Sequence, residues 1–175
     1  VEQRSVAGLA RVADTVGTVD EPPGSGIGRV DPTPIVRHLL ERGGTPDRFA
    51  QTLTLSLPVG IDRASLVSTI EAVVAHHDML RSVLVRDADG VHLDVRPQDA
   101  VRVDGLLRRG ADLSVEDIAA TLDPENGVML GLGWIDVGEH TAGRLVIAAH
   151  HLVVDVVSWG ILVADLVAAW AAVRS

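Results

Sequence analysis

The chain has 175 residues, of which 47% are hydrophobic, and a formal net charge of −9 at pH 7, which allows one domain with a hydrophobic core. The negative charge argues against nucleic-acid binding, because that needs clustered positive charge to displace counterions from phosphates. Since the chain has no cysteine, disulfides and thiolate metal sites are excluded, and we expect a reducing, cytoplasmic location.

The first 28 residues predict a linker rather than folded structure. Five Gly or Pro residues lie between Pro22 and Gly28, a density that is typical of linkers. Acidic residues interrupt the short apolar pieces before them, so no secretory signal is predicted. We expect the folded part to begin near Arg29.

The next segments alternate between helix and strand. A helix is expected over about 35–42, where a Gly–Gly pair ends it, and the alternating side chains of 49–57 predict a strand. Asp62 can cap a helix over about 63–76, because the apolar residues there follow the i, i+3, i+4 pattern.

The middle of the chain predicts a hairpin and a short helix. Residues 80–95 contain two strand-like runs around a turn at 87–90. A helix over 114–122 is expected to begin at Ser114, with Asp117 completing a capping box.

The last third of the chain is the most regular. We expect a strand over 128–137, a turn, a buried strand over 145–154, and a helix that Ser158 caps and that runs to about Arg174. The buried face of this helix should carry Leu162, Val163, Leu166, Val167, Trp170 and Val173.

Helices and strands in this mixture indicate an α/β (α+β) sandwich. The apolar run from 145 to 173 contains Asp155 and Asp165, which are costly inside a bilayer. We therefore interpret it as a buried strand followed by an amphipathic helix, and we expect no membrane contact.

Two adjacent histidines, His150 and His151, stand at the end of the apolar strand. Neighbouring strand residues point to opposite faces, so one imidazole can face the core and the other a cleft. Asp155 lies four residues after His151; in extended backbone it would share that face and orient an imidazole or pair with a buried arginine. A hydrogen-bonded core pair is the structural alternative. A metal site is disfavoured, because the helical i, i+4 ligand spacing is lacking.

A second pair, His76 and His77 before Asp78, falls at the end of a predicted helix. Histidine and a following polar residue are common at helix ends, where they interact with the last carbonyls. A structural role is therefore favoured for this pair, and no metal ligand set is expected in the chain.

The segment HHLVVDVVSW at 150–159 resembles the HHxxxDG motif of nonribosomal-peptide condensation domains and their epimerization relatives. Four further segments resemble parts of the same domains, in the same order: DPTPI at 31–35, FAQ at 49–51, HHDMLR at 76–81 and DPENGVML at 123–130. Because the series runs through most of the chain, it is more specific than one histidine pair.

The resemblance implies a chloramphenicol-acetyltransferase-like lobe over 29–175, which would be the N-terminal half of a V-shaped domain with two lobes. The second lobe would follow Ser175 and, in epimerization domains, would carry a catalytic glutamate. Residues 4–13 resemble the last helix of a peptidyl carrier domain, so the linker over 1–28 is expected to follow such a domain. An unrelated linker helix is the alternative.

The epimerization subtype is favoured by VDVVSWGIL at 154–162. The substrate would then be an aminoacyl or peptidyl thioester on the 4′-phosphopantetheine arm of a carrier domain, with no cofactor bound directly. A condensation domain that forms peptide bonds and an inactive carrier-docking domain are the alternatives. The sequence departs from the family at Val156, where glycine is usual, and at Gly160, where arginine is common. Val156 is expected to narrow the space beside His151.

By the same resemblance, His151 is the catalytic residue, because an imidazole can take or return a proton near neutral pH. The expected partners are a peptidyl carrier domain and the second lobe, and the uncovered face of a single lobe should favour self-association. Structural roles are expected for the other motif residues: His150 in the core, Asp155 paired with Arg81, Ser158 as helix cap and Trp159 packed under the motif.

Overall fold

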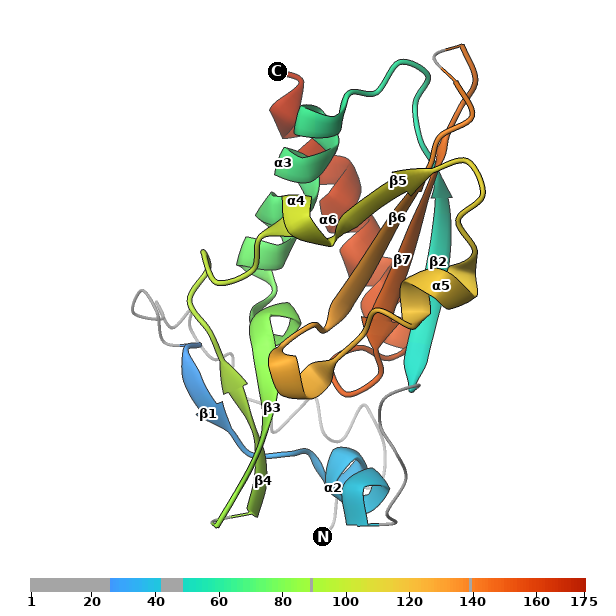
Figure 1. The fold of residues 1–175 in the computed structure, drawn as a ribbon. Helices are drawn as coiled ribbons and strands as arrows, with labels where there is room; N and C mark the ends of the chain where they lie inside the picture. The colour runs from blue at the N-terminus through green and yellow to red at the C-terminus, as the bar shows by residue number, and fades with distance from the viewer. Residues whose placement is uncertain (1–25, 42–48, 89, 139) are drawn as a thin grey trace, which may run out of the picture.

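A four-stranded sheet in the order β2-β7-β6-β5 is the centre of the fold (Figure 1). The computed structural model describes residues 26–41, 49–88, 90–138 and 140–175. Strand β7 pairs antiparallel with both β2 and β6, whereas β5 runs parallel to β6. The strands are β2 (Ala50–Ser56), β5 (Leu107–Gly110), β6 (Leu130–Ile135) and β7 (Arg144–His150).

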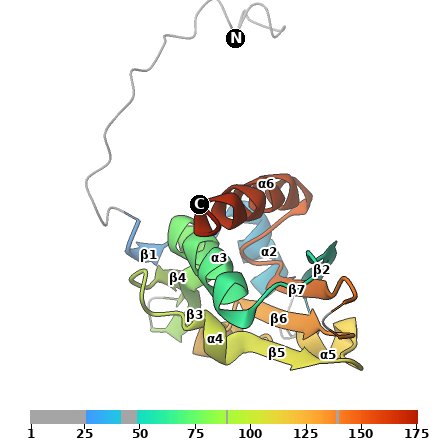
Figure 2. The ribbon, with the colours of Figure 1, turned by 90° about the horizontal axis from the view of Figure 1, so that it is seen from above.

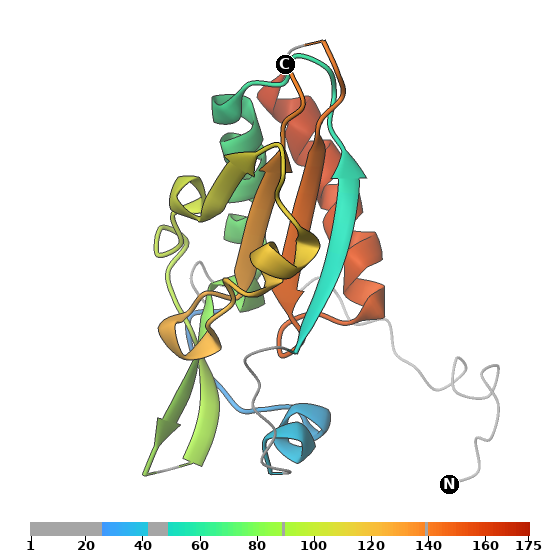
Figure 3. The same ribbon diagram turned by 45° about the vertical axis from the view of Figure 1, so that its right-hand side comes forward.

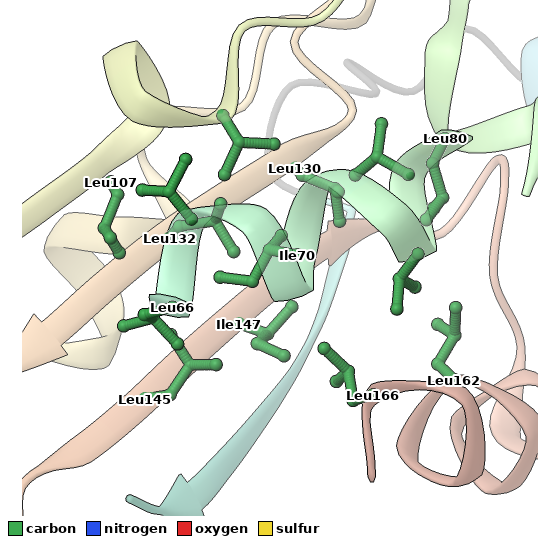
Figure 4. Packing of buried hydrophobic residues seen from close by; sticks show 14 of the residues in the cluster. Leu66, Ile70, Leu80, Leu107, Leu130, Leu132, Leu145, Ile147, Leu162 and Leu166 are labelled. Carbon is green, nitrogen blue, oxygen red and sulfur yellow. The ribbon is translucent and has the colours of Figure 1, made fainter. Parts of the chain in front are cut away.

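Two long helices, α3 (Arg63–His76) and α6 (Val156–Val173), cover one face of this sheet (Figure 2). The main core lies between the helices and the sheet, with Ile70 of α3, Ile147 of β7 and Leu166 of α6 in one buried cluster (Figure 4). Residues at alternate strand positions share a face, so every second side chain of β6 and β7 contributes to this core.

The short helix α5 (Val115–Ala119) packs on the opposite face of the sheet, where Ile118 and Val146 belong to a separate buried cluster. Two glycines of β6 permit the close approach. A Cβ atom at Gly131 would lie 2.4 Å from the carbonyl oxygen of Ile118, and one at Gly133 would lie 2.7 Å from its side chain. Helices on both faces of a mixed sheet confirm the expected α/β sandwich.

A smaller sheet in the order β1-β4-β3 lies beside one end of the larger sheet (Figure 3). Here Val36, Leu84 and Leu93 form a cluster with Leu152, a residue of the segment that follows β7. This end of the molecule therefore supports the segment that carries His151. Its elements are β1 (Gly28–Val30), α2 (Pro34–Glu41), β3 (Ser82–Asp87) and β4 (Gly90–Val95), and the remaining short helices are η2 (Asp78–Arg81), α4 (Val103–Leu106) and η3 (Pro124–Asn126).

Two predicted helix starts and the hairpin are confirmed. Asp62 accepts a hydrogen bond of 2.8 Å from the backbone N–H of Ser65 at the start of α3, and Ser114 with Asp117 forms the capping box of α5. Strands β3 and β4 pair antiparallel. The sequence did not predict β1, α4 and β5. Elements of three or four residues are too short to show the repeat of apolar residues that identifies a helix or a strand.

The boundary between the last strand and the last helix differs from the expectation. The strand expected over 145–154 ends at His150, and residues 151–153 form a turn. Helix α6 begins at Val156, because Asp155 and not Ser158 is its N-cap. A carboxylate at this position accepts the hydrogen bond of a free N–H group in the first turn, which fixes the start three residues earlier.

The buried face predicted for the last helix is also partly wrong. Leu162 and Leu166 are buried as expected, but Val167 and Val173 are 64% and 38% exposed. The reason is that α6 contacts α3 and the sheet through a narrow stripe, so a helix that is apolar all round leaves part of its apolar surface uncovered.

The outer surface of α6 is therefore apolar, and Val156, Val157 and Ile161 are exposed there. By length and composition, with a mean hydropathy of 2.0, this helix could also cross a membrane. In the described fold it belongs to the main core, and it carries Asp165 near its middle, which disfavours a bilayer centre. The same surface suits contact with another protein domain.

The expected linker over 1–28 and the carrier-like segment at 4–13 fall almost wholly outside the described residues. The described part begins at Gly26, and β1 begins at Gly28, one residue before the expected start of the folded part.

Candidate functional site

The two adjacent histidines diverge as expected. His150 is the last residue of β7 and has no exposed surface. Its backbone N–H donates to the carbonyl of Met129 at 2.9 Å, and its Nδ1 accepts a hydrogen bond of 3.2 Å from the backbone N–H of Leu152. The first bond continues the β6–β7 pairing and the second lies in the turn after β7, so His150 has a structural role in the fold.

His151 is partly exposed and lies one residue beyond the β2–β7 ladder. Its backbone N–H donates to the carbonyl of Phe49 at 2.7 Å, which continues the pairing past the end of both strands. The imidazole also stacks on the Phe49 ring, with centroids 4.6 Å apart and an angle of 18° between the planes. Backbone and side chain of Phe49 together fix where this imidazole lies.

Three side chains form a hydrogen-bonded chain that ends on His151. The indole Nε1 of Trp159 donates to Gln51 Oε1 at 2.7 Å, and Gln51 Nε2 lies 3.0 Å from His151 Nε2. Because an indole N–H can only donate, it must meet the amide oxygen, which turns the amide NH₂ group toward the imidazole.

This arrangement selects one tautomer of His151. The NH₂ group of Gln51 is a donor, so His151 Nε2 must accept with its lone pair. On the other side of the ring, His151 Nδ1 lies 2.6 Å from the carbonyl oxygen of Val154, which can only accept. The neutral form of the ring therefore carries its proton on Nδ1, and Nε2 is the nitrogen with the free lone pair.

A pocket of about 510 Å³ opens beside this imidazole, between α2 and the segment that follows β7. Its lining is mostly apolar, which suits an acyl chain rather than a highly charged ligand. His38 of α2 also lines it, and no motif or spacing in the sequence groups that residue with His151. The lining residues are Thr33, Ile35, Val36, His38, Leu39, Phe49, His151, Leu152, Val153, Val154, Asp155 and Ser158.

Asp155 and Ser158 form a capping box at the start of α6. Asp155 Oδ1 accepts from the backbone N–H and from the hydroxyl of Ser158, both at 2.8 Å, and the Ser158 hydroxyl accepts from the Asp155 N–H at 3.0 Å. The hydrogen bonds from Ser158 hold the pKa of Asp155 below its usual value of 3.8. Asp155 is thus an ionised, exposed cap, and it stabilises the segment that positions His151.

The expected pairing of Asp155 with Arg81 is wrong. Arg81 is buried, and it forms an ion pair of 2.5 Å with Asp78 in the same turn. Its guanidinium also donates to the carbonyl oxygens of Val74 and Ala75 at 2.7 and 2.8 Å. Arg81 therefore satisfies the last carbonyls of α3, and the exposed Asp155 needs no cationic partner because Ser158 supplies its hydrogen bonds.

The two departures from the family motif lie on the surface. Val156 is the first residue of α6 and is 78% exposed. It does not line the pocket, so the expected narrowing beside His151 is wrong. Its position is helical, which a β-branched residue can adopt. At Gly160, an added Cβ atom would meet nothing within 4 Å.

Trp159 combines packing with hydrogen bonding. Its ring packs against the main core, as expected, but its bond to Gln51 was not predicted. One signal was present in the sequence: the period of β2 places Gln51 on the same face as Leu53 and Leu55, where a polar side chain needs a partner.

Among the described residues, the histidine–carboxylate group that could hold a metal lies elsewhere, at the end of α3.

Comparisons with known proteins agree with this architecture. The family model described as "Condensation domain" matches residues 39–175. One protein of the linear gramicidin synthase of Brevibacillus parabrevis is 32% identical over 97% of this chain, and surfactin synthase subunit 2 of Bacillus subtilis is 31% identical over 79% of it. The chain spans 4% of each of these long proteins.

Solved structures share the fold. The epimerization domain from the third module of tyrocidine synthetase B superposes with a TM-score of 0.71 and 24% identity, over 83% of this chain and 35% of that one. The X-domain of teicoplanin biosynthesis, in its complex with OxyB, gives a TM-score of 0.69 and 24% identity, over 90% of this chain and 34% of that one. At such identities the likeness describes the fold, and this chain spans about a third of each solved chain.

Proposed function

Because this chain belongs to the condensation-domain family of nonribosomal peptide synthetases, we propose that it is the N-terminal lobe of an epimerization domain. In this proposal the domain inverts Cα of an aminoacyl or peptidyl group that is held as a thioester on the 4′-phosphopantetheine arm of a carrier domain. No further cofactor would take part in the reaction. The partners would be the carrier domain and the rest of the domain, of which this chain spans about a third by comparison with the tyrocidine structure.

The observation that carries the proposal is the tautomer of His151. A thioester acidifies its Cα–H bond because the enolate is delocalised onto the carbonyl oxygen. A neutral imidazole with a basic Nε2 can take that proton, and the Val154 carbonyl at Nδ1 stabilises the imidazolium that forms. Return of a proton to the opposite face of Cα gives the inverted product.

Gln51 fits this mechanism as a positioning residue. Its amide holds Nε2 of His151 in the absence of substrate, so it must move aside when Nε2 takes a proton. The bond from Trp159 anchors the amide oxygen, so the movement can be a small rotation about that contact. Asp155 acts through the helix start and is not expected to touch the substrate.

Inversion requires a second proton-transfer group on the opposite face of Cα. By family resemblance this group is a glutamate of the second lobe, so we expect this chain alone to be inactive. His38 lines the same pocket and offers an alternative. If the chain alone turns over substrate and His38→Ala abolishes that turnover, the two-lobe mechanism is contradicted. The second proton transfer would then be assigned to α2.

The test is exchange of the Cα proton for deuterium in heavy water, on a loaded carrier domain and in the intact synthetase. We expect His151→Ala to lower the rate by about 10²–10⁴-fold, as for loss of a general base. His140→Ala is the matched control, because His140 is exposed and lines a different pocket. Full exchange by the His151→Ala enzyme would contradict the assignment.

Peptide-bond formation is the second candidate, because the matching family model is that of the condensation domain. There the same imidazole would assist an amine that attacks the thioester. Chiral analysis of the carrier-bound product separates the two: an inverted residue supports epimerization, and a lengthened peptide without inversion supports condensation. A third candidate is an inactive docking domain, which the valine at position 156 in place of the family's glycine favoured. Val156 lies outside the pocket, so this argument for inactivity is weaker.

A further inference from the structure

A second group of chemistry-bearing side chains lies at the end of α3, outside the His151 site. His76 is the last residue of α3, and His77 is its C-cap, with extended backbone angles of φ −102° and ψ 95°. Within a helix, adjacent side chains would diverge by about 100°. Because the helix ends between these two residues, their rings approach instead, with centroids 5.0 Å apart in an edge-to-face arrangement.

Asp165 completes this group from α6. Its Oδ2 atom lies 2.7 Å from Nε2 of His77. One ligand atom from each of His76, His77 and Asp165 lies within 4.8 Å of the other two. His77 and Asp165 are 88 positions apart along the chain, so the group forms only when α3 and α6 pack together.

We propose that His76, His77 and Asp165 form a zinc-binding site that fastens the end of α3 to α6. Imidazole nitrogen and carboxylate oxygen are ordinary zinc ligands, at about 2.0–2.2 Å from the ion. Ligands at that distance in a tetrahedral site lie about 3.3 Å apart. Small side-chain rotations therefore bring the three atoms into range, and the fourth position is left to water.

The chemistry of the group selects zinc over magnesium. Magnesium prefers oxygen ligands in an octahedron, whereas two imidazoles and one carboxylate suit zinc and its transition-metal neighbours. The site is also open to an ion from solvent, since His76 is exposed and the side chains of His77 and Asp165 are 23% and 36% exposed.

The position of the site links it to the loop that carries His151. The pocket beside the histidine pair is lined by His76, His77, Val153, Val154 and Ser158, among others. Val154 supplies the carbonyl that holds His151 Nδ1. A zinc ion here would stiffen the packing of α6 on α3 directly behind that loop.

The experiment is calorimetric titration of this chain, stripped of metal by a chelator, with zinc chloride and separately with magnesium chloride. We expect one zinc ion per chain and no saturable magnesium binding. His76→Ala removes a ligand but keeps the His77–Asp165 contact, and Asp165→Asn keeps the shape but removes the charge. Each should weaken zinc binding by at least about 10-fold, and zinc should raise the Tm of the wild type more than that of either variant.

Two controls locate the ion. His140→Ala tests an exposed histidine elsewhere, and His151→Ala tests the HHxxxD motif as a competing site; both should bind zinc as the wild type does. The proposal is overturned if zinc does not bind saturably, if binding survives both His76→Ala and Asp165→Asn, or if His151→Ala abolishes it. Circular dichroism of each variant, in the absence of metal, separates lost binding from lost folding.

Discussion

Trp159 donates its indole N–H to Gln51 across 2.7 Å, which joins the first turn of α6 to the start of β2. The consequence is chemical as well as structural. By fixing the direction of the Gln51 amide, Trp159 determines which nitrogen of His151 carries the proton. Trp159 thus acts on the tautomer of His151 through the amide of Gln51.

Gln51→Glu should impair proton abstraction. A carboxylate at this position still accepts from Trp159, but it favours the charged imidazolium form of His151 and so removes the free base. We expect the acid limb of the pH–rate profile for Cα exchange to move to higher pH. Trp159→Phe keeps an aromatic ring and removes the N–H group; it should lower the rate without that shift. An unchanged profile in Gln51→Glu would show that the amide does not act on His151.

Asp155 should make the start of α6 sensitive to acid. Its pKa is depressed in the folded protein by the Ser158 hydrogen bonds, so its stabilising effect is present above the unfolded value near 3.8 and is lost as the pH falls through the folded value. Asp155→Asn keeps a capping acceptor that does not titrate. We expect its Tm to be below that of the wild type at neutral pH, with the difference shrinking toward pH 3. A constant difference would contradict this account.

Arg81 should couple to Asp78 and not to Asp155. Arg81→Met removes the guanidinium donor of the Val74 and Ala75 carbonyls, of which Ala75 keeps a bond from Gln98; the loss should cost about 1–3 kcal/mol of unfolding free energy. Double-mutant cycles measure the coupling by denaturant unfolding. We expect a coupling energy for Arg81→Met with Asp78→Ala and additivity for Arg81→Met with Asp155→Ala. Coupling in the second cycle would restore the pairing predicted from the sequence.

Two glycines should respond to alanine in opposite ways. Gly160 is exposed within α6 and its Cβ position is open, so Gly160→Ala should stabilise the chain by about 0.5–1 kcal/mol. Gly131→Ala would place its Cβ atom 2.4 Å from the Ile118 carbonyl oxygen and should destabilise it by about 1–3 kcal/mol. Thermal unfolding of both variants checks the signs, and stabilisation by Gly131→Ala would contradict the packing of α5.

The outer surface of α6 should cause self-association of this chain. Val156, Val157 and Ile161 are 78%, 72% and 54% exposed, and apolar patches of this kind mark contact surfaces. Sedimentation velocity should detect a concentration-dependent dimer that Val157→Asp with Ile161→Asp weakens. Glu71→Ala on the exposed side of α3 is a control for a surface change elsewhere. A monomer at all concentrations would contradict the prediction.

Much of the fold was predictable, because helix caps and hydrophobic periods are local signals. Asp62 and Ser114 marked their helices correctly, and the divergence of His150 from His151 followed from strand geometry. Two failures were local choices between candidates: Asp155 rather than Ser158 caps α6, and Arg81 pairs with Asp78, three residues before it. The others depend on tertiary packing, which decides how much of the apolar surface of α6 is buried. The role of Gln51 arises from a contact with Trp159 that is 108 positions away, which no periodicity encodes.

The alignment of β2 with β7 has a further consequence. Ala50 pairs with His150 and Gln51 with Ala149, and the His151–Phe49 bond follows directly from that alignment. A slip of one residue would turn Gln51 to the opposite face and replace it with Ala50 or Thr52. A misaligned chain could then retain its strand content and much of its compactness while losing the tautomer control of His151. Catalytic competence would therefore serve as a sensor of correct folding, more sensitive than spectra that report only average secondary structure.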